Sequence, residues 1–329
     1  ELDPEYGAAH YNLGNALKAQ GDLAEAIASY RRALELNPEY ASAHYNLGIS
    51  LKAQGDLVEA VASYRRALEL NPEYASAHYN LGISLKAQGD LVEAVASYRR
   101  ALELNPEYAA AHYNLGHALK AQGDLAEAVA SYRRALELNP EDAAAHYNLG
   151  HALKAQGDLA EAVASYRRAL ELNPEYASAH YNLGISLKAQ GDLVEAVVHY
   201  RRAVELDPEY VVAHNNLGIA LAAQKDLPGA EAAYRRALEA KPDYANALGN
   251  LGDLLLRQRG GEERLREAED LLRRAVALAP KNPIHIANLG FLLQTKGQLE
   301  EAESFYRRAL EIRPNYPWCQ RKLDALLGA

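Results

Sequence analysis

The chain has one cysteine, no methionine and no excess of basic residues. Because Cys319 is alone, no disulfide forms within the chain, and a reducing compartment is the default expectation. The formal net charge of -9 disfavours nucleic-acid binding, since phosphates require a basic surface. An intracellular, cytoplasmic location is favoured, although no residue specifies it.

Long hydrophobic runs are also missing. No segment is apolar over the length that a bilayer crossing needs, and no signal peptide is present, so we expect no membrane contact from these residues. The first residue is Glu1, and its hexapeptide "ELDPEY" recurs at Glu205–Tyr210, the end of a repeat. We therefore expect a piece of a longer protein, in which residues 1–6 are the remnant of a preceding repeat. A signal, an anchor or a catalytic domain could lie outside it.

Catalytic motifs are absent as well. No P-loop, dinucleotide fingerprint or zinc motif occurs, and the Ser, His and Asp residues only recur with the repeat. We therefore predict a chain without enzymatic activity and without a cofactor. The stretch "RGGEER" at Arg259–Arg264 is too sparse for a phosphate cradle. We interpret it as a charged surface insertion, with a partner-binding protrusion as the alternative.

A repeated unit of 34 residues fills the chain. Residues 41–74 and 75–108 are identical, and the next two units differ only at Asp142 and Tyr176. The eighth unit has four extra residues near "RQRGGEERLRE". The nine predicted repeats are 7–40, 41–74, 75–108, 109–142, 143–176, 177–210, 211–244, 245–282 and 283–316.

Each repeat is predicted to contain two helices. In the second repeat the first helix covers about Ala41–Gln54, and Gly55 suits a left-handed cap at its end. Asp56 then caps the second helix, with Glu59 completing a capping-box-like pattern. This helix ends near Leu70, because the proline that follows in "NPEY" cannot continue it.

The side chains of each helix divide into two faces at 100° per residue. On the first helix one face holds His44, Leu47, Gly48 and Leu51, and the other holds Ser42, Tyr45, Asn46, Ile49, Lys52 and Ala53. The second helix has one apolar stripe, made of Leu57, Ala60, Val61, Tyr64, Ala67 and Leu68. Neither helix buries its stripe alone, so successive repeats are expected to stack in an all-α solenoid.

The repeat resembles the tetratricopeptide repeat (TPR). The family pattern of Leu-Gly, Ala, an aromatic residue, Ala and Pro is matched by Leu47-Gly48, Ala60, Tyr64, Ala67 and Pro72. Two departures are His44, where many members have tryptophan, and Leu272 at the aromatic position of the eighth repeat.

The resemblance implies a right-handed superhelix of helix-turn-helix repeats whose first helices line a concave groove. Residues 317–329 would then form a C-terminal capping helix. Trp318 and Leu323 would cover the last repeat, while Arg321, Lys322 and Asp324 would face water.

Three polar residues recur on the groove side of the first helices. Asparagine occupies one position in all nine repeats: Asn12, Asn46, Asn80, Asn114, Asn148, Asn182, Asn216, Asn250 and Asn288. Beside it six repeats carry tyrosine: Tyr11, Tyr45, Tyr79, Tyr113, Tyr147 and Tyr181. One turn further on, the same six carry lysine: Lys18, Lys52, Lys86, Lys120, Lys154 and Lys188.

These residue types suit an extended peptide ligand. An asparagine amide has N–H donors and a carbonyl acceptor, so it can form hydrogen bonds with a peptide backbone whatever the ligand's side chains are. Lysine attracts acidic groups, and tyrosine adds flat contact area at low entropic cost. The asparagine ladder also resembles that of the TPR region of O-linked N-acetylglucosamine transferase, where asparagines hold the substrate polypeptide. We therefore predict a protein-binding scaffold, with the acidic nature of its ligand suggested by the lysines.

Several alternatives stay open. The asparagines could be inherited consensus, and the lysines could simply be solvated. The chain could be the substrate-recruiting arm of a glycosyltransferase whose catalytic domain lies elsewhere. It could also be a structural solenoid that associates end to end through an apolar face at Leu13 and Leu17. Identical neighbouring repeats would also fit partial engineering, although the irregular last three repeats favour a natural source.

A fourth ladder consists of histidines, and it suggests a metal site only at first sight. Its members are His10, His44, His78, His112, His146, His180 and His214. Stacked helices lie roughly 8–10 Å apart, whereas zinc holds its nitrogen ligands at about 2 Å. Successive histidines therefore cannot share one ion, and we interpret them as interface residues.

Overall fold

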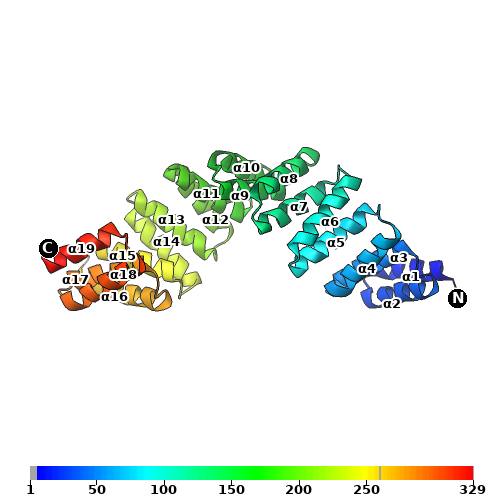
Figure 1. The fold of residues 1–329 in the computed structure, drawn as a ribbon. Coiled ribbons are helices and arrows are strands. Elements are labelled where there is room, and N and C mark those ends of the chain that lie inside the picture. The colour runs from blue at the N-terminus through cyan, green and yellow to red at the C-terminus, as the bar shows by residue number, and fades with distance from the viewer. Residues whose placement is uncertain (1–5, 259–260, 329) are drawn as a thin grey trace. The chain divides into compact units, whose positions relative to one another are not determined.

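The computed structural model describes residues 6–258 and 261–328, which form nineteen helices and no strand. The predicted all-α solenoid of helix-turn-helix repeats is confirmed (Figure 1). The first helices are α1 Gly7–Gln20, α3 Ala41–Gln54, α5 Ala75–Gln88, α7 Ala109–Gln122, α9 Ala143–Gln156, α11 Ala177–Gln190, α13 Val211–Ala223, α15 Ala245–Arg257 and α17 Pro283–Thr295. The second helices are α2 Leu23–Leu36, α4 Leu57–Leu70, α6 Leu91–Leu104, α8 Leu125–Leu138, α10 Leu159–Leu172, α12 Leu193–Leu206, α14 Leu227–Ala240, α16 Gly261–Leu278 and α18 Leu299–Ile312.

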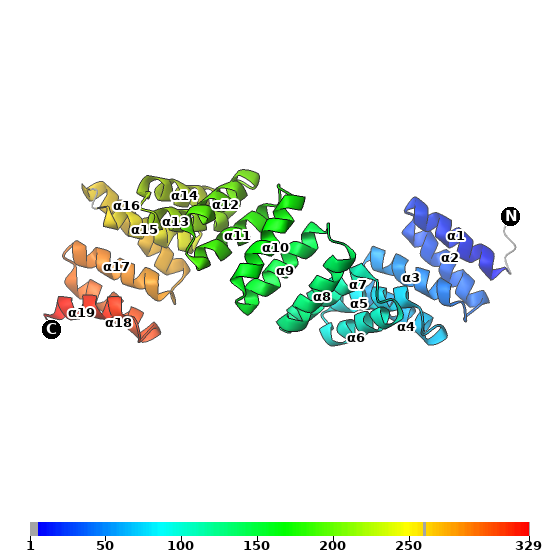
Figure 2. The same ribbon diagram turned by 90° about the horizontal axis from the view of Figure 1, so that it is seen from above.

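The chain divides into two compact units, Glu1–Pro174 and Glu175–Ala329. Within each unit every first helix packs on the second helix of its own repeat, and that helix packs on the next first helix (Figures 1 and 2). The division into nine repeats stays a prediction, and repeats are numbered by it below. Residues 1–5, 259, 260 and 329 lie outside the described residues, and with them most of the predicted remnant 1–6 and the start of "RGGEER".

A tyrosine of the second helix fills the core of most repeats. Tyr64 of α4 is 0% exposed, and its ring lies against Gly48 of α3. A Cβ added to Gly48 would lie 2.7 Å from Cε1 of this ring, so the position accepts no side chain without displacing it. The prediction that these tyrosines are core residues is confirmed for Tyr30, Tyr64, Tyr98, Tyr132, Tyr166, Tyr200 and Tyr234.

The turn between the two helices follows the predicted pattern. Gly55 ends α3 with a φ of 95°, and Asp56 Oδ1 accepts a hydrogen bond from the Glu59 N–H at 3.1 Å. The Glu59 carboxylate does not complete a capping box. It accepts two hydrogen bonds from Arg31 Nη2 of the preceding repeat, at 2.7 and 2.8 Å. Equivalent pairs join second helices along the first unit: Arg65–Glu93, Arg99–Glu127 and Arg133–Glu161.

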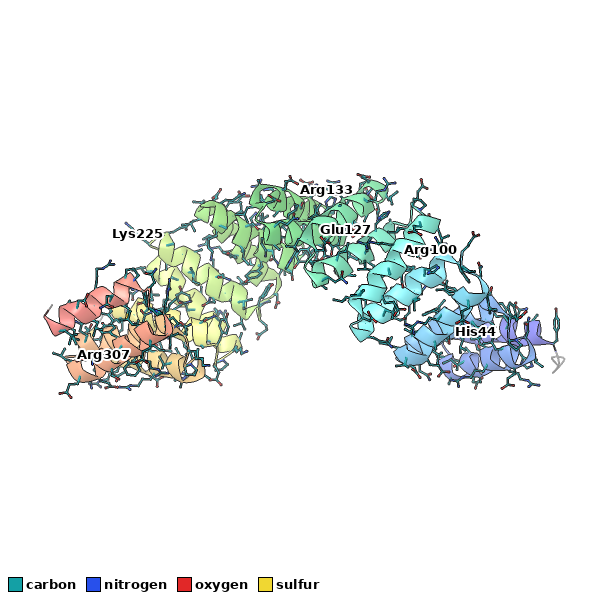
Figure 3. The ribbon with its side chains drawn as sticks, viewed as in Figure 1. His44, Arg100, Glu127, Arg133, Lys225 and Arg307 are labelled. Carbon is teal, nitrogen blue, oxygen red and sulfur yellow. The ribbon has the colours of Figure 1, made fainter. Side chains whose placement is uncertain are left out.

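One turn has lysine where the other repeats of the 34-residue type have glycine. Lys225 follows α13 with a φ of 67°, and its backbone N–H caps the Ala222 carbonyl (Figure 3). A left-handed conformation costs a residue with a Cβ roughly 1–2 kcal/mol. We therefore expect Lys225→Gly to raise the free energy of unfolding by about 1 kcal/mol, measured by urea denaturation. Lys225→Ala removes the same side chain but keeps the strain, and an equal gain from it would contradict the explanation.

The last two repeats depart from the others. The second helix α16 has 18 residues against 14 in its counterparts, and this difference equals the four extra residues of the eighth repeat. The tail forms α19, Pro317–Leu327, which packs on α18 and α17 with Leu323 buried. Lys322 is half-buried, and its ammonium lies over the ring of Phe291, 4.2 Å from the centroid. A half-buried aromatic ring there offers a cation a favourable face.

Candidate functional site

The predicted tyrosine, asparagine and lysine of each repeat lie on one first helix. We call the surface that they form the asparagine face, and its residues in the first unit are Tyr11, Tyr45, Tyr79, Tyr113, Tyr147, Asn12, Asn46, Asn80, Asn114, Asn148, Lys18, Lys52, Lys86, Lys120 and Lys154. Most of these side chains are half-buried, although Asn12 is exposed and Asn148 is buried. The face is therefore a packed surface with accessible polar groups.

In repeats two to five, the asparagine is bound by the lysine and the tyrosine of the repeat before it. Asn80 Oδ1 accepts a hydrogen bond from Lys52 Nζ at 2.7 Å, and Asn80 Nδ2 donates to Tyr45 Oη at 3.1 Å. The same pair of bonds recurs along the first unit at Asn46, Asn114 and Asn148. The three ladders are thus one network that joins neighbouring repeats.

The asparagine amide is almost fully used within the protein. Asn80 Nδ2 also donates to the Ser76 carbonyl, one helical turn earlier, at 2.9 Å. Both of its N–H groups are then engaged, and one lone pair of Oδ1 remains. The sequence predicts that the amide holds a peptide through both its donor and its acceptor. For that, the amide would have to give up bonds within the protein and form bonds to the peptide instead. A ligand on this face first meets the lysine ammonium and the tyrosine hydroxyl.

The lysines of this network are cations with a neutral partner. Burial lowers the pKa of Lys18, Lys52, Lys86 and Lys120, and no neighbouring acid offsets that loss of hydration. Among the described residues, arginines of the second helices form ion pairs with glutamates, as at Arg65–Glu93. None of these four lysines forms one with a described residue. An amide oxygen compensates an ammonium less than a carboxylate does. The asparagine face therefore carries four positive charges without acidic partners among the described residues, those of Lys18, Lys52, Lys86 and Lys120.

The tyrosines of the asparagine face lie on the same first helices as the lysines and pack against other tyrosine rings. The Tyr45 ring lies 4.6 Å from that of Tyr74, the last residue of the same repeat, and 6.0 Å from the core ring of Tyr64. Burial raises the pKa of Tyr45, so its hydroxyl stays protonated and able to donate at neutral pH. The contacts recur at Tyr11 and Tyr79. These rings are held in place before any ligand arrives.

In the second unit the network is reduced. Asn216 Nδ2 donates to Tyr181 Oη at 2.9 Å, as in the first unit. Asn182 donates to the Ser178 carbonyl at 2.9 Å, and Lys188 lies on the same helix. Asn250 Nδ2 donates to Asn215 Oδ1 at 2.9 Å, so an amide replaces the tyrosine hydroxyl as acceptor. Within the first unit, the structure brings the predicted residues together at Asn46, Asn80, Asn114 and Asn148.

The histidines hold the turns between repeats. His44 Nε2 donates to the Pro38 carbonyl at 3.0 Å, and the same bond recurs at His78, His112, His146 and His214. Burial is the main cause of a lowered pKa for His44. In the part of the chain that the structure describes, no group of three or more His, Cys, Asp or Glu side chains is arranged to hold a metal ion.

Comparison with solved structures gives three informative relatives. "YrrB: a TPR protein with an unusual peptide-binding site" is 28% identical, with a TM-score of 0.52 over 60% of this chain and 97% of that chain. The MamA protein is 25% identical, with a TM-score of 0.50 over 52% of this chain and 93% of that chain. The APC/C hetero-tetramer Cut9-Hcn1 is 15% identical, with a TM-score of 0.58 over 98% of this chain and 76% of that chain, and it supports the fold alone.

A comparison with curated protein sequences found no match. None of the described helices combines the length and the hydrophobicity that crossing a membrane requires. Family models match nearly the whole chain. The model described as "TPR repeat" covers residues 14–55, 50–89, 84–123, 116–157 and 150–191, and two described as "Tetratricopeptide repeat" cover 181–245, 215–283 and 261–324. The chain therefore belongs to the tetratricopeptide repeat family.

Proposed function

We propose that this chain is a protein-interaction scaffold that binds an extended acidic peptide along the asparagine face. The observation that carries the proposal is a row of four half-buried lysines, each bound to an asparagine oxygen and paired with no acidic group among the described residues: Lys18, Lys52, Lys86 and Lys120. A carboxylate that reached such an ammonium would replace part of its lost hydration. The similar structure of YrrB, described as a TPR protein with an unusual peptide-binding site, gives further support.

The spacing of the rows favours an extended ligand. Neighbouring first helices lie roughly 8–10 Å apart, and an extended chain advances about 3.3 Å per residue. About three ligand residues would therefore pass each repeat, so an acidic residue at every third position would meet successive lysines. Because burial lowers the lysine pKa, a bound carboxylate would raise it again, and binding at alkaline pH would take up protons.

Two labelled peptides test this function by fluorescence anisotropy. One has four copies of Gly-Ser-Asp, and the other has four copies of Gly-Ser-Asn. We expect the first to bind more tightly, and to lose about tenfold in affinity when Lys52, Lys86 and Lys120 are all changed to glutamine. Three accessible charge pairs at about 0.5 kcal/mol each amount to that factor.

A matched control lies on the second helices. Arg66, Arg100 and Arg134 are exposed and pair with a glutamate three residues away. Changing all three to glutamine removes the same charge from another surface (Arg100 is labelled in Figure 3). Equal losses in the two triple variants, or equal affinity for the two peptides, would refute the proposed binding face.

If the chain is the substrate-recruiting arm of a glycosyltransferase, the asparagine face would also have to bind a peptide. The experiment therefore tests the shared step, and a parent gene that encodes a glycosyltransferase domain would support that alternative. End-to-end association would show instead as a mass that rises with concentration in light scattering.

A further inference from the structure

A cavity of about 740 Å³ opens among the last two repeats, within the second unit. Its apolar walls are Leu256 of α15, Leu265 of α16 and Phe291 of α17. It is also lined by Arg257 of α15, Thr295 of α17 and Lys322 of α19. This volume lies within the range of roughly 300–1,000 Å³ that is typical of ligand pockets.

The departures of the last repeats create this cavity. Leu256 stands where the first six repeats carry the ladder lysine, and Phe291 stands where the second repeat has Ile49. The longer α16 begins at Gly261, and its first turns bring Glu262 and Leu265 to the cavity. At Leu256 an apolar side chain therefore replaces a charged one, while Asn250 and Asn288 keep the asparagine position.

The cavity has a cation at its mouth that lacks an acidic partner. Lys322 Nζ lies 4.2 Å from the Phe291 centroid and 5.9 Å from that of Trp318, and no described carboxylate pairs with it. Glu262 is bound by Arg266 at 2.9 Å, and Arg257 Nε donates to Asp253 at 2.8 Å. The group left for a ligand's carboxylate is thus the ammonium of Lys322.

We propose that this cavity binds a bulky apolar side chain of a peptide, with a neighbouring acidic residue held by Lys322. An aliphatic or aromatic side chain would contact Leu256, Leu265 and Phe291, while the carboxylate would pair with the ammonium above the aromatic ring. This site shares no residue with the asparagine face of the first unit. It therefore stands or falls independently of the proposed function.

The single tryptophan of the chain makes the site observable. Trp318 contacts Phe291 edge-on, with 5.8 Å between the ring centroids. The probes are the acetylated hexapeptides "SDLFDS", "SDAADS" and "SNLFNS". We expect only the first to give a strong, saturable change in tryptophan fluorescence, with at least fivefold weaker binding of the other two. No saturable change below about 1 mM would overturn the proposal.

Two variants and one control locate the binding. Thr295 is exposed at the end of α17, so Thr295→Phe fills the cavity at little cost to the fold, and Lys322→Glu reverses the charge. Lys281→Glu makes the same charge change in an exposed turn. With a dye on the first peptide, we expect both site variants to weaken binding at least fivefold and the control to leave it unchanged. Wild-type affinity in Lys322→Glu, or equal loss in Lys281→Glu, would refute the site.

Discussion

Replacing Gly82 by alanine should lower the free energy of unfolding by about 2 kcal/mol. A Cβ at this position would lie 2.7 Å from Cε1 and 2.8 Å from Cδ1 of Tyr98, whose side chain is 0% exposed. Overpacking of this kind costs up to about 3 kcal/mol when the neighbour cannot move. Alanine regains about 1 kcal/mol of helix propensity, which leaves the net loss.

The ninth repeat offers a matched control for this prediction. A Cβ at Gly290 would lie 3.1 Å from Cδ1 of Tyr306, which is looser by several tenths of an ångström. Chemical denaturation of both alanine variants should therefore show a loss near zero for Gly290→Ala. Equal losses at Gly82 and Gly290 would show that the contact with the ring is not the cause.

Replacing Asn80 by alanine should also cost about 2 kcal/mol of stability. The change removes the acceptor of Lys52, the donor to Tyr45 and the bond to the Ser76 carbonyl. Each such bond contributes about 1 kcal/mol, and the gain in helix propensity offsets part of the sum. The half-buried ammonium of Lys52 would be left without its oxygen partner.

The first repeat provides the comparison. Asn12 occupies the same position on α1 but is exposed, and the structure gives it no hydrogen bond to another described residue. Asn12→Ala should change stability by less than about 0.5 kcal/mol in the same denaturation experiment. A double-mutant cycle with Lys52→Met should give a coupling energy of about 1 kcal/mol with Asn80→Ala. Additive effects would show that the two side chains do not support each other.

Most of the fold was predictable because the first six repeats show the same helix-end signals. A left-handed glycine, an aspartate cap and a proline mark the helix ends, and the predicted bounds of Ala41–Gln54 agree with α3. The close pairing of Gly48 with Tyr64 was also predictable, since two helices meet where one residue is small. The helix ends and this contact depend on residues within one repeat, and the same residues recur in the other repeats.

The hydrogen bonds between repeats were not predicted. Helical periodicity shows which face of its own helix a side chain occupies, but not which side chains of another helix it meets. Lys52 and Asn80 lie 28 residues apart, and Tyr45 and Asn80 lie 35 apart. Those separations become contacts only when the stacking offset is known. The sequence did contain a signal, since Tyr, Asn and Lys recur together in six repeats. The same limit applies to the cavity beside Phe291, which four different helices build.

The position of a bound acidic peptide tests the proposed function most directly. A crystal structure of the protein with the Gly-Ser-Asp peptide would give it. We expect the peptide to run along the first helices of the first unit, with aspartate carboxylates within about 4 Å of the ammonium groups of Lys52, Lys86 and Lys120. A peptide bound instead along the second helices, beside pairs such as Arg65–Glu93, would contradict the proposal.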